Sequence, residues 1–97
     1  MFFEDDKGIC FGNISISKDL KHISCSTAIY HNFNTIVVAK DVDKKRYIVS
    51  ACEDNGNFNP IKSSCFYAYT LFQSDDNNKK FEKWLNDNGI KIEVIGI

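Results

Sequence analysis

The chain has 97 residues, twelve of them Lys or Arg and thirteen Asp or Glu, which gives a formal net charge of −1. This length predicts a single domain over residues 1–97, and the balanced charge argues against nucleic-acid binding, which usually needs a basic face. No run approaches the ~20 apolar residues of a membrane span, and no secretion signal is present at the N-terminus, so we expect a cytoplasmic protein with no membrane contact.

The first third of the chain is predicted to form strands. Residues 8–17 end in an alternation of Ile and Ser that is typical of a strand, with a bend at Gly12. Residues 17–20 resemble a turn. Residues 21–30 leave strand and helix open, but their Ser, Thr and Ile content favours a strand.

The middle of the chain contains the clearest hairpin signal. Residues 35–40 and 46–52 are rich in β-branched side chains and flank a charged turn at residues 41–45. A loop is predicted over residues 53–64, where Asn-Gly and Asn-Pro dipeptides are typical of turns.

The last third of the chain is predicted to form a strand, a helix and a second strand. Residues 65–72 are a continuous apolar and aromatic run of strand length, and residues 90–94 alternate with period two. Between them we predict a helix over residues 75–88, with Ser74 or Asp75 as its N-cap.

The helix carries a narrow apolar stripe formed by Phe81, Trp84 and Leu85, which predicts packing on one face of a sheet. The predicted fold class is therefore α+β. We expect a single twisted, mainly antiparallel sheet of about five to six strands, with one C-terminal helix packed on one face, in the order β-β-β-β-β-α-β.

Metal binding is not indicated. Four cysteines are spread along the chain without a close pair, and whether any of them pair stays open: Cys10, Cys25, Cys52 and Cys65. The one tight His/Cys cluster is His22, Cys25 and His31, whose spacing matches no standard zinc pattern. We expect no metal and no cofactor.

Catalysis is not indicated either. No glycine-rich phosphate cradle occurs in the chain. The turn at residues 41–45 begins like a calcium loop but places Lys where an oxygen ligand is needed. We therefore predict no catalytic residues and a protein that is not an enzyme.

A repeated tripeptide is the most suggestive functional feature. Asn32-Phe33-Asn34 and Asn57-Phe58-Asn59 each place a Phe inside a polar loop. In one interpretation each ring plugs the edge of the core, as large aromatic side chains usually do. In the other, the rings are exposed anchors for a partner and form a contact surface together with Tyr30.

The C-terminal segment Ile92–Ile97 is apolar on both faces of the predicted strand. Either this strand is central in the sheet, or a second copy of the chain covers it. An exposed apolar edge strand favours pairing with another chain, so the segment is a candidate site of homo-oligomerisation.

These features favour a small non-enzymatic protein-binding module, of an inhibitor or immunity/anti-defence type, that acts on an unidentified protein partner through its surface loops. An alternative is a protein that binds or sequesters a small molecule, such as an anionic ligand or nucleotide, alone or as an oligomer. Its candidate contacts are Arg46, Tyr67, Tyr69, His22 and His31. Arg46 is the single guanidinium of the chain and the natural partner for an anion.

A third interpretation is stacking of single-stranded nucleic acid on Phe66, Tyr67, Tyr69 and Phe72. Such platforms usually lie in a positively charged groove. The composition does not supply one, so nucleic acid ranks below the other two ligands.

Overall fold

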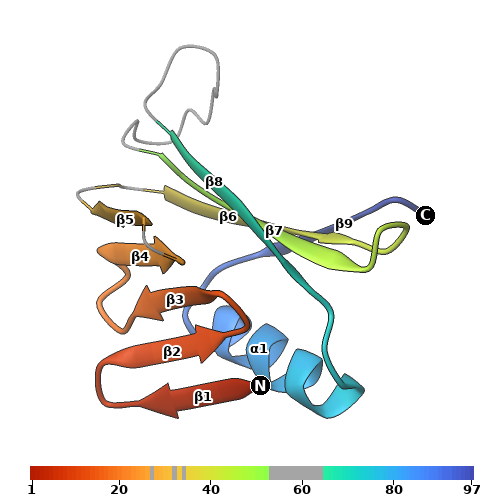
Figure 1. Cartoon of the computed structure of the whole chain (residues 1–97), viewed down its shortest axis with the longest axis horizontal. Helices are drawn as coiled ribbons and strands as arrows, with labels where there is room; N and C mark the ends of the chain where they lie inside the picture. The colour runs from red at the N-terminus through yellow and green to blue at the C-terminus, as the bar shows by residue number, and fades with distance from the viewer. Residues whose placement is uncertain (27, 32, 34, 53–64) are drawn as a thin grey trace.

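The computed structural model describes residues 1–26, 28–31, 33, 35–52 and 65–97, without the side chains of His31, Cys52 and Cys65. Within these ranges the chain forms nine strands and one helix (Figure 1). The elements in chain order are β1 (Phe2–Asp5), β2 (Gly8–Phe11), β3 (Ile14–Ser17), β4 (His22–Cys25), β5 (Ala28–His31), β6 (Thr35–Asp41), β7 (Arg46–Cys52), β8 (Cys65–Leu71), α1 (Asp75–Asp87) and β9 (Ile92–Ile95).

The first five strands form one antiparallel sheet, sheet A, in which each strand pairs with the next along the chain. The prediction of one bent strand over residues 8–17 was wrong, because the chain reverses at Gly12 and folds this stretch into β2 and β3. Gly12 has a φ of 59°, a left-handed conformation that glycine adopts easily. Within the range 21–30, residues 22–25 and 28–30 are extended, as predicted, but they divide into β4 and β5, with Ser26 in a left-handed conformation (φ 54°) at the end of β4.

The remaining strands form a second sheet, sheet B, in the order β8-β7-β6-β9. The predicted hairpin is confirmed, since β6 and β7 pair over their whole length. β8 pairs with β7 in antiparallel orientation, whereas β9 pairs with β6 in parallel orientation. β8 and β9 therefore lie at opposite edges of sheet B.

The α+β class, the mainly antiparallel pairing and the C-terminal helix are confirmed, but the prediction of a single sheet was wrong. The physical reason is that one helix can cover only one face of one sheet. When the strands divide into two sheets that pack around the same helix, each sheet can bury an inner row of apolar side chains. Figure 1 shows this arrangement, with α1 against sheet A and below sheet B.

The core lies where the two sheets and the helix meet. Phe11 of β2 stacks on Phe81 of α1, with ring centroids 4.3 Å apart. Tyr47 of β7 contacts both rings edge-on, at 5.7 and 5.1 Å. All three side chains are fully buried. These contacts fix sheet B relative to sheet A.

A polar network ties the helix to sheet B beside this cluster. The Tyr47 hydroxyl donates to Oε2 of Glu82 (2.5 Å), and the same oxygen accepts from Nζ of Lys40 (3.0 Å). The buried hydroxyl therefore has a charged acceptor, which offsets its removal from water.

The helix begins and ends much as the sequence predicts. Ser74 is the N-cap, and its side chain accepts a hydrogen bond from the backbone N–H of Asn77 (3.2 Å). Two aspartates in the first turn complement the positive end of the helix dipole. Asn88 is the C-cap, and Gly89 follows in a left-handed conformation (φ 76°).

Candidate functional site

The outer face of sheet B carries a row of exposed apolar side chains on β8. Tyr67, Tyr69 and Leu71 are 64%, 51% and 62% exposed, whereas Ala68 and Thr70 between them are buried. This is the alternation of a strand with one face toward the core and one toward solvent. We call the surface formed by Tyr67, Tyr69, Leu71 and the neighbouring Arg46 the tyrosine face.

The register of β7 and β8 determines how this face is assembled. Leu71 lies opposite Arg46, and Tyr69 lies opposite Ile48. Residues directly opposite on antiparallel strands project from the same face of the sheet. Arg46 therefore borders the row at the turn end of β7.

Arg46 is held in place by two contacts. Its guanidinium lies over the ring of Tyr69, 5.0 Å from the centroid. Its Nε donates to Oδ2 of Asp41 at 3.2 Å, and Asp41 is buried. The backbone N–H of Lys44 also donates to Asp41 (3.3 Å), so the carboxylate bridges the hairpin turn and the arginine. The result is an ordered patch without net charge.

The chemistry of this patch suits contact rather than catalysis. Tyr and Arg are enriched among the residues that dominate binding energy in protein interfaces. A tyrosine ring brings a large contact area at a low cost in conformational entropy. The patch is also open and lies on a regular sheet, so it offers a rigid surface.

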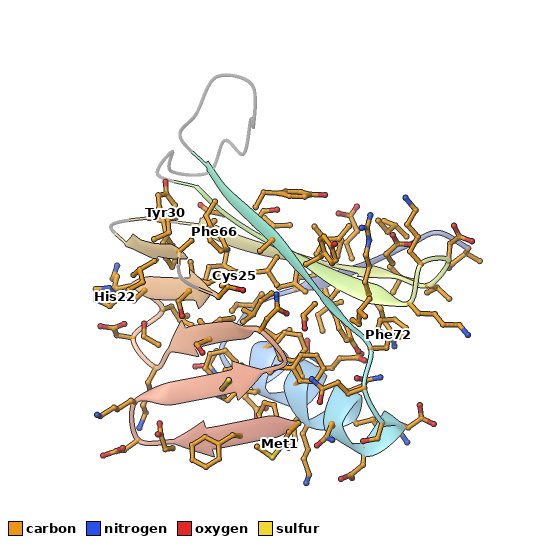
Figure 2. The ribbon with its side chains drawn as sticks, viewed as in Figure 1. Met1, His22, Cys25, Tyr30, Phe66 and Phe72 are labelled. Atoms are coloured by element: carbon orange, nitrogen blue, oxygen red, sulfur yellow. The ribbon has the colours of Figure 1, made fainter. Side chains whose placement is uncertain are left out.

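Phe33 does not form part of an exposed surface. It is 2% exposed and belongs to the core, which matches the interpretation of a ring that plugs the core edge rather than that of an exposed anchor. Tyr30 is half-buried and stacks on Phe33 at 5.8 Å and on Phe66 at 6.0 Å. Figure 2 shows Tyr30 and Phe66 next to each other where β5 approaches β8. These rings join the two sheets.

The rest of the proposed loop surface lies outside the described residues. This holds for both asparagines around Phe33 and for the whole second tripeptide, namely Asn32, Asn34, Asn57, Phe58 and Asn59. Their role as partner contacts stays a prediction.

The five contacts expected for a small ligand do not converge. Arg46, Tyr67 and Tyr69 belong to the tyrosine face, whereas His22 is an exposed residue at the start of β4 in sheet A. Figure 2 shows His22 at the left-hand end of β4 in sheet A. The backbone of His31 pairs with His22, and its side chain lies outside the description.

The four-ring platform expected for nucleic acid is not assembled. Phe66 and Phe72 are half-buried and pack against the core, whereas Tyr67 and Tyr69 are exposed on the outer face. Because successive residues of a strand point to opposite faces, these rings cannot stack bases together.

The outer face of sheet A contains a groove that the sequence analysis did not predict. Phe3 and Ile29 stand at its two sides, and the register places three small side chains between them, namely Cys10, Ser15 and Ser24. The cavity above this floor has a volume of about 410 Å³. The two large and three small side chains are visible in the sequence, but their arrangement as a groove can be recognised only once the register of the five strands is known.

The C-terminal strand lies at the edge of sheet B, so the alternative of a central strand was wrong. β9 pairs with β6 on one side, and none of the described strands pairs with its other side. Val94 is 50% exposed and Ile95 is 38% exposed. The apolar excess in this segment is therefore a feature of the surface.

Across the described ranges, no group of three His, Cys, Asp or Glu side chains is placed to hold a metal ion. Cys10 and Cys25 are free thiols. The backbones of Cys52 and Cys65 are directly opposite each other in the β7–β8 register. In the part of the chain that the structure covers, α1 is also too short and polar to cross a bilayer.

Leu71 is the residue of the tyrosine face that the sequence analysis did not name as a candidate contact. The strict alternation of Tyr67, Tyr69 and Leu71 could have revealed it, because an edge strand with one buried face exposes every second residue.

Comparison with protein-family models, with curated proteins and with solved structures finds no match. The function is therefore argued from the residues themselves.

Proposed function

We propose that this chain is a small, non-enzymatic protein-binding module of the inhibitor or immunity type, and that it contacts its partner through the tyrosine face. The observation that supports this proposal is the row of Tyr67, Tyr69 and Leu71, exposed in one register with Arg46 ordered beside it. Large apolar side chains exposed together on a rigid element are typical of interaction sites.

The nature of the face limits the kind of partner. The Arg46–Asp41 pair carries no net charge, because the guanidinium lies against the carboxylate. We therefore expect a flat, mainly apolar protein surface as the partner, and binding that depends weakly on salt.

The test is affinity purification of the tagged protein from its native host, followed by mass spectrometry. The double variant Tyr67→Ser/Tyr69→Ser removes the two rings from an exposed position, so its melting temperature should stay close to that of the wild type. The matched control is Ile29→Ser, which removes a side chain that is 72% exposed on sheet A.

We expect one stoichiometric protein with the wild type and with the Ile29→Ser control, and its loss with the double variant. With the purified partner, each tyrosine should account for about 30-fold in affinity or more, since interface anchors contribute about 2 kcal/mol or more each. Equal recovery with the double variant would contradict this role of the tyrosine face.

The groove on sheet A supports a second candidate function, binding of a small molecule. Its volume lies within the range of roughly 300–1,000 Å³ that is usual for such sites. Lys7 and His22 lie among its lining residues beside Asp5, so a neutral ligand suits it better than a strongly anionic one. A thermal-shift screen against metabolites tests this, because a ligand at 100 times its dissociation constant should stabilise the fold by about 2.7 kcal/mol. A screen without hits would remove this candidate.

A further inference from the structure

We propose that Cys52 and Cys65 form a redox site, at which a small-molecule disulfide such as oxidised glutathione closes an intrachain bond between β7 and β8. The bond would join the two strands at the end from which residues 53–64 connect them along the chain. This site is a place of covalent modification, and it is independent of any partner of the tyrosine face.

The register of β7 and β8 places Cys52 directly opposite Cys65. The same register determines which kind of pair they form. The N–H of Phe72 donates to the carbonyl of Lys45 at 2.9 Å, and these two residues continue the register just past the strand ends. They are therefore a hydrogen-bonded pair. Because hydrogen-bonded and non-hydrogen-bonded pairs alternate along an antiparallel ladder, Cys52 and Cys65 form a non-hydrogen-bonded pair.

A contact at the centre of β8 supports this assignment. Tyr69 lies opposite Ile48, and the alternation makes them a non-hydrogen-bonded pair as well. The carbonyl of Tyr69 should then be directed away from β7. It accepts a hydrogen bond from the side chain of Asn13 in sheet A at 3.3 Å, as this direction requires.

The spacing of a non-hydrogen-bonded pair suits a disulfide. Its opposite Cα atoms lie about 4.5 Å apart, and the Cα atoms of disulfide-bonded cysteines usually lie roughly 4.4–6.8 Å apart. The two backbones are therefore within reach of the bond. The other two cysteines differ, because the register of sheet A places Ser15 opposite Cys10 and Ile14 opposite Cys25.

The position of the pair determines what the bond would do. Strand periodicity places both positions on the outer face of sheet B, in line with Tyr67. Among the described strands, β8 pairs only with β7, so its end can open locally when the hydrogen bonds between them break. A covalent bond at the first residue of β8 would keep this end paired. Oxidation would thus fix the strand that carries the tyrosines.

The chemistry is thiol–disulfide exchange. The thiolate of one cysteine attacks a sulfur of oxidised glutathione, which forms a mixed disulfide and releases one reduced glutathione. The second thiolate attacks the protein sulfur of that mixed disulfide and releases the other glutathione. The two cysteines lose two electrons and two protons in total, and the oxidant gains them. In a reducing compartment the reverse reaction opens the bond.

The experiment equilibrates the folded protein, at low concentration, with a series of ratios of reduced to oxidised glutathione. After an acid quench, the remaining thiols are labelled with a maleimide in denaturant and counted by mass spectrometry. Trypsin cleaves after Lys62, which lies between the two cysteines, so the bond would hold two peptides together. The variants are Cys52→Ser and, as the matched control, the double variant Cys10→Ser/Cys25→Ser.

We expect the wild type to lose two of its four thiols in one step, with the bond mapped to Cys52 and Cys65. The control variant should lose its two thiols at the same glutathione ratio. Cys52→Ser should form no intrachain bond. The same titration in concentrated urea should need a more oxidising ratio, by a factor on the order of 100, because closing a loop of about 15 residues costs the unfolded chain freedom that the folded chain has already lost.

Four free thiols at every ratio would overturn the proposal, as would a bond that maps to another pair or joins two chains. Glutathione attached to single cysteines in place of the intrachain bond would overturn it too. Equal titrations with and without urea would show that the fold does not bring the two cysteines together. None of these measurements involves a partner, so this site and the proposed function can fail separately.

Discussion

The side-chain amide of Asn13 donates a hydrogen bond to the backbone carbonyl of Tyr69, at 3.3 Å. Asn13 lies in the turn between β2 and β3 of sheet A, and Tyr69 lies in β8 of sheet B. The bond therefore joins the two sheets. The accepting carbonyl of Tyr69 lies on the side of β8 that faces away from β7.

This position matters because β8 has no protection of its own. The strand is seven residues long and contains no charged residue and no proline. Such strands are prone to pair with other chains when their edge is open. Asn13 occupies the edge at its centre.

Replacement of Asn13 by Asp keeps the shape of the side chain but removes the donor. We expect the free energy of unfolding to fall by about 1 kcal/mol, the usual contribution of one hydrogen bond. The variant should also aggregate faster on storage, followed by light scattering. The matched control Asn86→Asp changes an exposed helical asparagine and should aggregate at the wild-type rate. Identical behaviour of the two variants would contradict the role of Asn13 at the β8 edge.

Tyr47 should make stability depend on alkaline pH. Burial raises the pKa of the Tyr47 phenol well above its ordinary value of 10.0, and the hydrogen bond and charge of Glu82 raise the pKa further. Above pH 10 the unfolded chain therefore loses a proton that the folded chain keeps. This contribution to stability is complete below that pH, and above it decreases by about 1.4 kcal/mol per pH unit.

Tyr47→Phe isolates this effect. At pH 7 we expect a loss of about 1.5–3 kcal/mol, because a hydrogen bond to a charged acceptor disappears. In urea unfolding at pH 9 and pH 11, the difference between wild type and variant should narrow at the higher pH. A constant difference would show that the Tyr47 hydroxyl has an unperturbed pKa.

Phe33 should behave as a core residue. We expect Phe33→Ala to lower the free energy of unfolding by about 3–5 kcal/mol, the usual effect of emptying a buried aromatic site. Phe3→Ala is the same chemical change at a side chain that is 51% exposed, and it should cost less than about 1 kcal/mol. Equal effects in chemical denaturation would show that Phe33 is not buried in solution.

Two glycines with positive φ should respond differently to alanine. At Gly8 a Cβ atom would overlap with the carbonyl oxygen of Ile16 on the paired strand, so β2 and β3 would have to separate. At Gly89 nothing lies within 4 Å of the added atom. We expect Gly89→Ala to cost about 1 kcal/mol from backbone strain alone, and Gly8→Ala to cost clearly more. Thermal unfolding of both variants measures these two losses of stability.

The elements that carry strong local signals could be predicted from the sequence. Ser74 and Gly89 bound the helix because their conformations there are intrinsic to these residue types. The β6–β7 hairpin was predictable for the same reason, since its β-branched strands flank a charged turn. Such local preferences need no information about the rest of the chain.

What could not be predicted depends on contacts between distant residues. The turn at Gly12 looks like a bend within one strand until β2 and β3 are seen to pair. Phe33 was open to two interpretations because polar neighbours say nothing about the direction of a ring. The tyrosine face and the groove on sheet A are properties of register, which a pattern along one strand does not contain.

The two sheets also differ in how far apart their partners lie along the chain. Every pairing in sheet A joins consecutive strands, whereas Val38 of β6 must find Ile92 of β9. Closing long loops costs entropy before the distant contacts form, so local pairings are faster. We expect refolding to build sheet A early and to add β9 to sheet B late, after α1 has docked. The strand β9, at the edge of sheet B, would then be in place only in molecules whose folding is complete.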